Sequence, residues 1–255
     1  MGIDIFVHAV RLVLGDWRNA VRISGLLYLI YAIPSLILQL LFPPLPETAS
    51  AADVAAALAT APVGLLIAIF ALVAFVWIAV AWHRYVLLDE MPAGQFPEFN
   101  GSRLVSYAVY SLGIGLLAVV AAILVGIVAG LVVAIVPPLA FLAALVALAA
   151  ALIVGYRFAA LLPASAVGKP LTFGAAWEAT KGANRDIIVL AVVSVIAAFI
   201  IDLPALIFAF AGPVGGFLAL IWTLGTGWVK MLVGVSILTT LYGHFVEGRA
   251  IPPAR

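Results

Sequence analysis

The sequence predicts an all-α membrane protein with six transmembrane helices. Hydrophobic residues fill 67% of its 255 positions and charged residues only 9%, whereas soluble domains are about half apolar and a quarter charged. Apolar runs of about 20 residues or more recur, which is the length that crosses about 30 Å of hydrocarbon. All but one of the 12 Lys and Arg residues fall in four segments that can share one side of a membrane. Residues 1–255 are therefore predicted to form a single polytopic domain.

A short amphipathic helix is predicted at about residues 3–14. Its apolar residues recur at helical spacing, while Asp4, His8 and Arg11 share the opposite face. This pattern is typical of a helix that lies in the plane of the membrane surface. No small-residue cleavage site follows it, so the segment is expected to be retained rather than removed as a signal peptide.

Six membrane spans follow, and prolines bend or end some of them. They are predicted at about residues 20–42, 63–88, 103–136, 139–162, 184–211 and 213–245. Pro34 is expected to bend the first span, and Pro137 and Pro138 end the third. A tight Gly and Pro turn separates the last two spans, which must therefore be antiparallel neighbours. Three antiparallel hairpins describe the whole set, with a second interfacial helix at about residues 173–181.

The Lys and Arg residues orient these spans. The basic loop and terminal residues are Arg11, Arg18, Arg22, Arg84, Arg103, Arg157, Lys169, Lys181, Arg185, Arg249 and Arg255. With six spans, all of these residues fall on one side, and the loops on the opposite side contain no Lys or Arg. Because basic loops stay in the cytoplasm, both termini are predicted to be cytoplasmic.

Lys230 is the exception, because it sits inside the sixth apolar span. Two interpretations are open. Lys230 can pair within the hydrocarbon with Asp202 of the fifth span, since the two side chains lean toward each other in an antiparallel pair. Alternatively the long sixth helix overhangs the bilayer and Lys230 reaches the cytoplasmic surface. Gly225 and Gly227 are also expected to loosen this helix, as in transporters with broken helices.

Basic and aromatic residues gather at the predicted helix ends. His83, Arg84, Arg157 and His244 are candidates to contact an anionic lipid headgroup near the cytoplasmic surface. The alternative is that each side chain only anchors its own helix. Glu90, beside Asp89 at a helix end, is interpreted as a solvated interfacial residue.

Small residues recur at every fourth position of the third and fourth spans. Gly126 and Gly130 belong to one such row and Gly155 to the other. Rows of this kind let helix backbones approach closely in lipid. They predict packing within the hairpin rather than a dimer interface.

The search for catalytic chemistry is negative. The chain has three histidines without the paired spacing of a helical zinc site, and it has no cysteine. It lacks a Gly-x-Ser-x-Gly elbow and a phosphate-binding loop. A net charge of +1 gives no reason to expect nucleic acid. We therefore expect no metal, no cofactor and no enzymatic activity.

Three short motifs carry a resemblance to a known group. They are Trp82-His83-Arg84-Tyr85, the segment from Ala176 to Gly182, and Leu241-Tyr242-Gly243-His244. With the six-span plan, they resemble uncharacterised bacterial six-helix integral membrane proteins, which are similar to the membrane portion attached to some glycerophosphodiester phosphodiesterases. The resemblance implies the bacterial inner (cytoplasmic) membrane. It does not carry over the esterase activity, because the chain has no soluble catalytic domain.

The function expected from the sequence is therefore non-enzymatic. The protein is predicted to associate with membrane lipids or to bind another membrane protein. The alternative is a transporter or channel that moves a small solute along the fifth and sixth spans, where Lys230 and Asp202 lie.

Overall fold

The computed structural model describes residues 1–41, 48 and 50–253, and all regular structure in this part of the chain is helical. Six helices are long and apolar enough to cross a membrane. They are α2 (Trp17–Leu41), α3 (Ala51–Leu88), α4 (Gly101–Ile135), α5 (Ala140–Arg157), α8 (Asn184–Ala209) and α9 (Gly212–Phe245). The predicted all-helical class with six helices of membrane-spanning length and composition is confirmed.

Short helices complete the described part of the chain, and two of them were not predicted. α1 (Gly2–Leu14) and α7 (Phe173–Ala179) lie where interfacial helices were expected, and the short 3-10 helix η1 (Pro137–Leu139) joins α4 to α5. The fourth span was expected to reach residue 162, but α5 ends at Arg157 and a separate helix, α6 (Leu161–Val167), follows. Leu161 to Ala166 are all buried within the protein. Hydropathy alone cannot separate burial in protein from burial in lipid.

The start of α3 also differs from the prediction. The helix begins at Ala51 rather than near residue 63. Ser50 caps it, because the Asp53 backbone N–H donates to the Ser50 hydroxyl at 3.2 Å and the Ser50 backbone N–H donates to the Asp53 carboxylate at 2.8 Å. This reciprocal capping box satisfies backbone donors that a helix start leaves without partners. Pro62 is therefore accommodated inside a long helix instead of preceding it.

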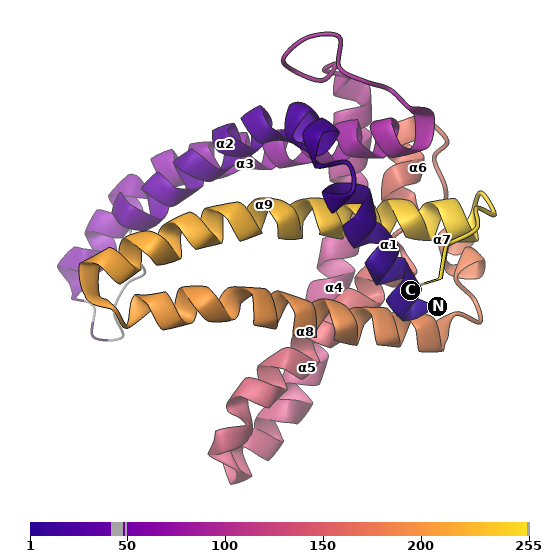
Figure 1. Cartoon of the computed structure of the whole chain (residues 1–255). Helices are drawn as coiled ribbons and strands as arrows, with labels where there is room; N and C mark the ends of the chain where they lie inside the picture. Colours follow the sequence, from indigo (N-terminus) through magenta and orange to yellow (C-terminus); the bar gives the residue numbers. More distant parts are fainter. Residues whose placement is uncertain (42–47, 49, 254–255) are drawn as a thin grey trace.

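Consecutive long helices are each other's main packing partners. α2 packs chiefly against α3, α4 against α5, and α8 against α9. Figure 1 shows α8 and α9 as neighbours joined by a turn, with α1 crossing them, while the lower ends of α4 and α5 extend away from the other helices. We refer to these as the three helix pairs.

The protein core lies at one end of the helix pairs. Its fully buried members include Trp82 of α3, Leu190 of α8 and Leu232 of α9, which join α6 and the buried face of α1. The opposite ends are exposed and apolar, as at Leu131 (67% exposed) and Phe210 (92% exposed). The core end is also the end that carries most of the Lys and Arg residues. The apolar arms that extend from it have the surface that lipid covers in a bilayer.

Candidate functional site

A cavity of about 400 Å³ lies between α1, α5, α8 and α9. Phe6 and Val10 of α1, Leu152 of α5 and Val195 of α8 are typical of its wall, which is largely apolar. A volume of this size falls within the range of roughly 300–1,000 Å³ that small-molecule sites occupy. No direct signal in the sequence points to this cavity, because its walls come from four separate helices.

Helix α1 closes one side of this cavity. Ile5, Ala9 and Val13 are fully buried against the protein, which leaves Phe6 and Val10 on the neighbouring face to line the cavity. Helical spacing produces both faces. The α1 backbone approaches α8 closely at Gly2, whose N–H donates to the Asp186 carboxylate at 3.1 Å.

His8 lies on the polar face of α1, outside the wall of this cavity. Burial, and to a smaller extent the neighbouring Arg11, lower the pKa of His8 from its usual value of 6.5. His8 is therefore neutral at pH 7. The docking of α1 then does not depend on a histidine charge near neutral pH.

Three polar side chains interrupt the apolar wall. The Tyr156 hydroxyl donates to the Ser194 hydroxyl at 2.9 Å, so these two groups partner each other across α5 and α8. Lys230 of α9 is the one charged side chain among the described residues that line the cavity. The cavity is thus an apolar space with a single cationic group in its wall.

Lys230 is paired with Asp202. Its ammonium donates to the two carboxylate oxygens of Asp202 at 2.6 and 2.8 Å, joining α9 to α8. The structure therefore brings the two predicted residues together. Lys230 is followed by 15 residues of continuous α9, which at helical rise place it about 22 Å from the helix end at Phe245. The two side chains are 33% and 44% exposed, so the pair is only partly covered by protein.

A second, more open groove of about 720 Å³ lies between α2 and α9. Here the Tyr28 hydroxyl donates to the Leu224 carbonyl at 2.8 Å, and the Trp228 indole N–H donates to the Ser24 hydroxyl at 2.8 Å. A Cβ added at Gly227 would lie 2.7 Å from the Tyr28 hydroxyl. Gly227 therefore permits this contact, and α9 is continuous through Gly225 and Gly227 rather than broken.

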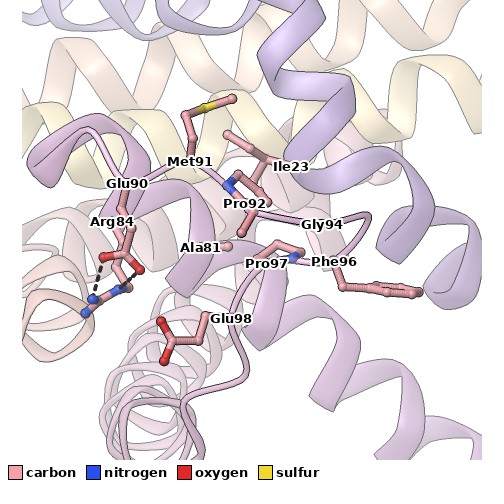
Figure 2. Close-up of a pocket in the computed structure, with 11 residues that line it drawn as sticks. Ile23, Ala81, Arg84, Glu90, Met91, Pro92, Gly94, Phe96, Pro97 and Glu98 are labelled. Carbon is pink, nitrogen blue, oxygen red and sulfur yellow. Dashed lines mark hydrogen bonds and ion pairs between the residues drawn. The ribbon is translucent and has the colours of Figure 1, made fainter.

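The predicted headgroup contact Arg84 is engaged within the protein. Its guanidinium binds the Glu90 carboxylate at 2.5 and 3.1 Å and the Ala166 carbonyl at 3.2 Å. Glu90, which was interpreted as solvated, is therefore an ion-pair partner. Figure 2 shows this pair at the edge of a pocket of about 370 Å³, with Pro92 and Glu98 of the following loop. Arg84 thus connects α3 to this loop and to α6.

The other three predicted headgroup contacts also have internal partners. The Arg157 guanidinium donates to the Thr180 carbonyl at 2.5 Å and lies 4.9 Å from the centre of the Trp177 ring, which fastens α7 to the end of α5. The His244 Nδ1 atom lies 3.0 Å from the Arg249 carbonyl oxygen. These contacts place the side chains at helix junctions.

His83 is the most enclosed of the four. It is 0% exposed, and its ring nitrogens lie 2.7 Å from the Thr239 hydroxyl and 3.3 Å from the Tyr107 hydroxyl. The ring is therefore not accessible to a headgroup in this conformation. The pocket lined by Arg84 does not include His83, Arg157 or His244, so the structure does not gather the four residues around one space.

The three glycines predicted to pack helices do not make close contacts. A Cβ added at Gly126, Gly130 or Gly155 meets no heavy atom within 4 Å. α4 and α5 do pack against each other, but the close approach expected at these glycines is not found there. In an alanine-rich helix, small residues recur at every fourth position whether or not a partner helix uses them.

No group of three or more His, Cys, Asp or Glu residues in the described part of the chain is arranged to hold a metal ion. No protein-family model, curated protein or solved structure matches the chain. The cavity beside Lys230 is therefore the feature from which a function is inferred.

Proposed function

We propose that this chain is a non-enzymatic, multi-pass protein of the bacterial inner membrane that binds lipid in the cavity between α1, α5, α8 and α9. The apolar wall of this cavity is the observation that carries the proposal. Burial of apolar surface stabilises a bound acyl chain by about 25 cal/mol per Å². Exposed apolar surface on the helix pairs is the kind of surface that lipid covers in a bilayer, and this supports lipid as the ligand.

A lipid fits this cavity better than a hydrated solute. A polar solute that enters a protein must exchange its water for hydrogen bonds, and each group left without a partner costs about 1–3 kcal/mol. The wall offers few hydrogen bonds in exchange, because the Tyr156 hydroxyl binds Ser194 and Asp202 takes two of the three donors of Lys230. A transporter for a small solute along α8 and α9 would need a polar route past both charges. Lys230 lines the cavity and Asp202 does not, which favours lipid binding over transport.

Lipid retention tests this proposal. Replacing Gly234 by leucine fills the cavity, because Gly234 lines it and an added Cβ there meets no protein atom within 4 Å. Replacing Gly130 by leucine is the matched control, since Gly130 also has open space around it and lies outside the cavity wall. Native mass spectrometry in mild detergent should show lipid bound to the wild type and to Gly130→Leu, and much less bound to Gly234→Leu. Equal retention by all three proteins would contradict the proposal.

We further propose that the three helix pairs are antiparallel hairpins with both chain termini in the cytoplasm. The distribution of Lys and Arg supports this orientation, since 11 of the 12 then lie in cytoplasmic segments or at the helix ends that adjoin them. A reporter fused after Arg255 should be active in the cytoplasm, and one inserted at the turn between α8 and α9 should be active on the other side. The reverse pattern would overturn this topology.

A further inference from the structure

We infer that the cavity between α1, α5, α8 and α9 takes a neutral amphiphile: one long apolar body that ends in a single oxygen acceptor, such as a hydroxyl or carbonyl group. The acceptor binds Lys230, and the apolar body fills the rest of the cavity. This inference rests on the proposed lipid-binding function and specifies the chemical class of the ligand.

The polar end of the ligand is assigned from the donors of Lys230. An ammonium group has three N–H donors, and the two oxygens of Asp202 occupy two of them at 2.6 and 2.8 Å. The third donor has no acceptor in the described part of the chain, and the Lys230 side chain forms part of the cavity wall. The Tyr156 hydroxyl donates its hydrogen to Ser194 at 2.9 Å, so the Ser194 O–H is the other donor in the wall. A hydrogen bond from an ammonium group is roughly twice as strong as one from a neutral hydroxyl. Lys230 is therefore the site at which a ligand oxygen gains most.

The neutral charge of the ligand follows from charge balance. Lys230 and Asp202 together carry no net charge, and no other side chain in the described wall is charged. A carboxylate or sulfate head would place two anions around one cation at a depth where an unbalanced charge costs about 3 kcal/mol. A neutral oxygen accepts the hydrogen bond and leaves the pair balanced. Lys230 therefore selects an oxygen acceptor, and Asp202 disfavours an anion.

The extent of the apolar part sets the shape of the ligand. Lys230 and Ile201 lie at one end of the cavity wall, because the Lys230 side chain binds Asp202, which follows Ile201 in α8. Ser194 and Tyr156 lie at the other end, about 10 Å away along α8 at helical rise. The wall between them includes Val195, Ala198 and Val233. A chain with a small head can lie along this wall, and a chain longer than the wall continues through the open side of the cavity.

Binding of two probes with the same chain tests the inference. The full chain, purified in mild detergent, is assayed for saturable binding of radiolabelled 1-hexadecanol by scintillation proximity. Unlabelled 1-hexadecanol and hexadecyl sulfate serve as competitors, because they share one chain and differ in the head, which is a small neutral hydroxyl in the first and a larger, permanently ionised sulfate in the second. We expect the alcohol to compete at least about tenfold better than the sulfate, which corresponds to about 1.4 kcal/mol. Competition by the sulfate that equals or exceeds that of the alcohol would overturn the inference.

Three variants separate this inference from the proposed function. The Lys230→Met/Asp202→Leu double variant removes the donor without leaving a lone charge, so it should bind 1-hexadecanol about tenfold more weakly and lose the preference over the sulfate. An unchanged affinity and preference would contradict the role of Lys230. Gly234→Leu should abolish saturable binding, while Gly130→Leu should retain it. If Gly234→Leu removes the binding of neither probe, the proposed function itself fails. If the cavity binds the sulfate more tightly than the alcohol, only the inference of a neutral ligand fails.

Discussion

Replacing Trp82 by alanine should lower the free energy of unfolding of the detergent-solubilised protein by about 3–5 kcal/mol, the range for large-to-small changes at a buried aromatic residue. Trp82 is 0% exposed, and its indole N–H donates to the Ser236 hydroxyl at 2.7 Å. The substitution therefore opens a cavity where α3 meets α9 and also removes a buried hydrogen bond. Equilibrium unfolding, followed by circular dichroism, measures the loss.

Two controls interpret this result. Trp17→Ala changes a tryptophan that is 55% exposed, so it should cost less than about 1 kcal/mol. Trp82→Phe keeps most of the packing and removes the bond to Ser236, so its cost should fall between those of the two alanine variants. Equal losses for Trp82→Ala and Trp17→Ala would mean that the core at the basic end of the helix pairs does not dominate stability.

The length and hydropathy of the apolar segments were sufficient to predict the long helices, because a membrane span needs about 20 apolar residues whatever it packs against. The same signal could not predict which residues face protein. Leu131 and Leu232 are equally apolar, yet Leu131 is 67% exposed and Leu232 is 0% exposed. For the same reason the fourth span was predicted to continue past Arg157 to residue 162, since the first residues of α6 are as apolar as those of a transmembrane helix. The location of the core became visible only in the structure.

The candidate site was predicted in part. The pairing of Lys230 with Asp202 was one of two open interpretations, because the sequence places both charges in adjacent antiparallel spans but does not show whether Lys230 reaches back along α9 to Asp202 or outward to the surface. The partners of the cations at the helix ends could not be predicted in the same way. Arg84 binds the Ala166 carbonyl and Arg157 the Thr180 carbonyl, and both acceptors depend on how α6 and α7 fold back onto the long helices. The cavity depends on the same tertiary placement of α1 and α5.

A double-mutant cycle at Asp202 and Lys230 should give a large coupling free energy. Asp202→Leu alone leaves the Lys230 ammonium without its carboxylate, and Lys230→Met alone leaves the carboxylate without its cation. Each single change should destabilise the protein in bicelles by about 2–3 kcal/mol, near the cost of a lone charge in the middle of a span. The double variant should be close to the wild type, because replacing both members of an ion pair with apolar residues removes the cost of desolvating two charges.

The size of this coupling decides between the two interpretations of Lys230. If its ammonium reached the membrane surface, water would replace the carboxylate, and Asp202→Leu would change stability by less than about 0.5 kcal/mol. A coupling of about 2 kcal/mol or more requires that the pair lie where water does not compensate. The pair is 33% and 44% exposed, so the surface it presents must then face lipid or the cavity rather than solvent. A large coupling would therefore also support Lys230 as the polar end of an otherwise apolar site.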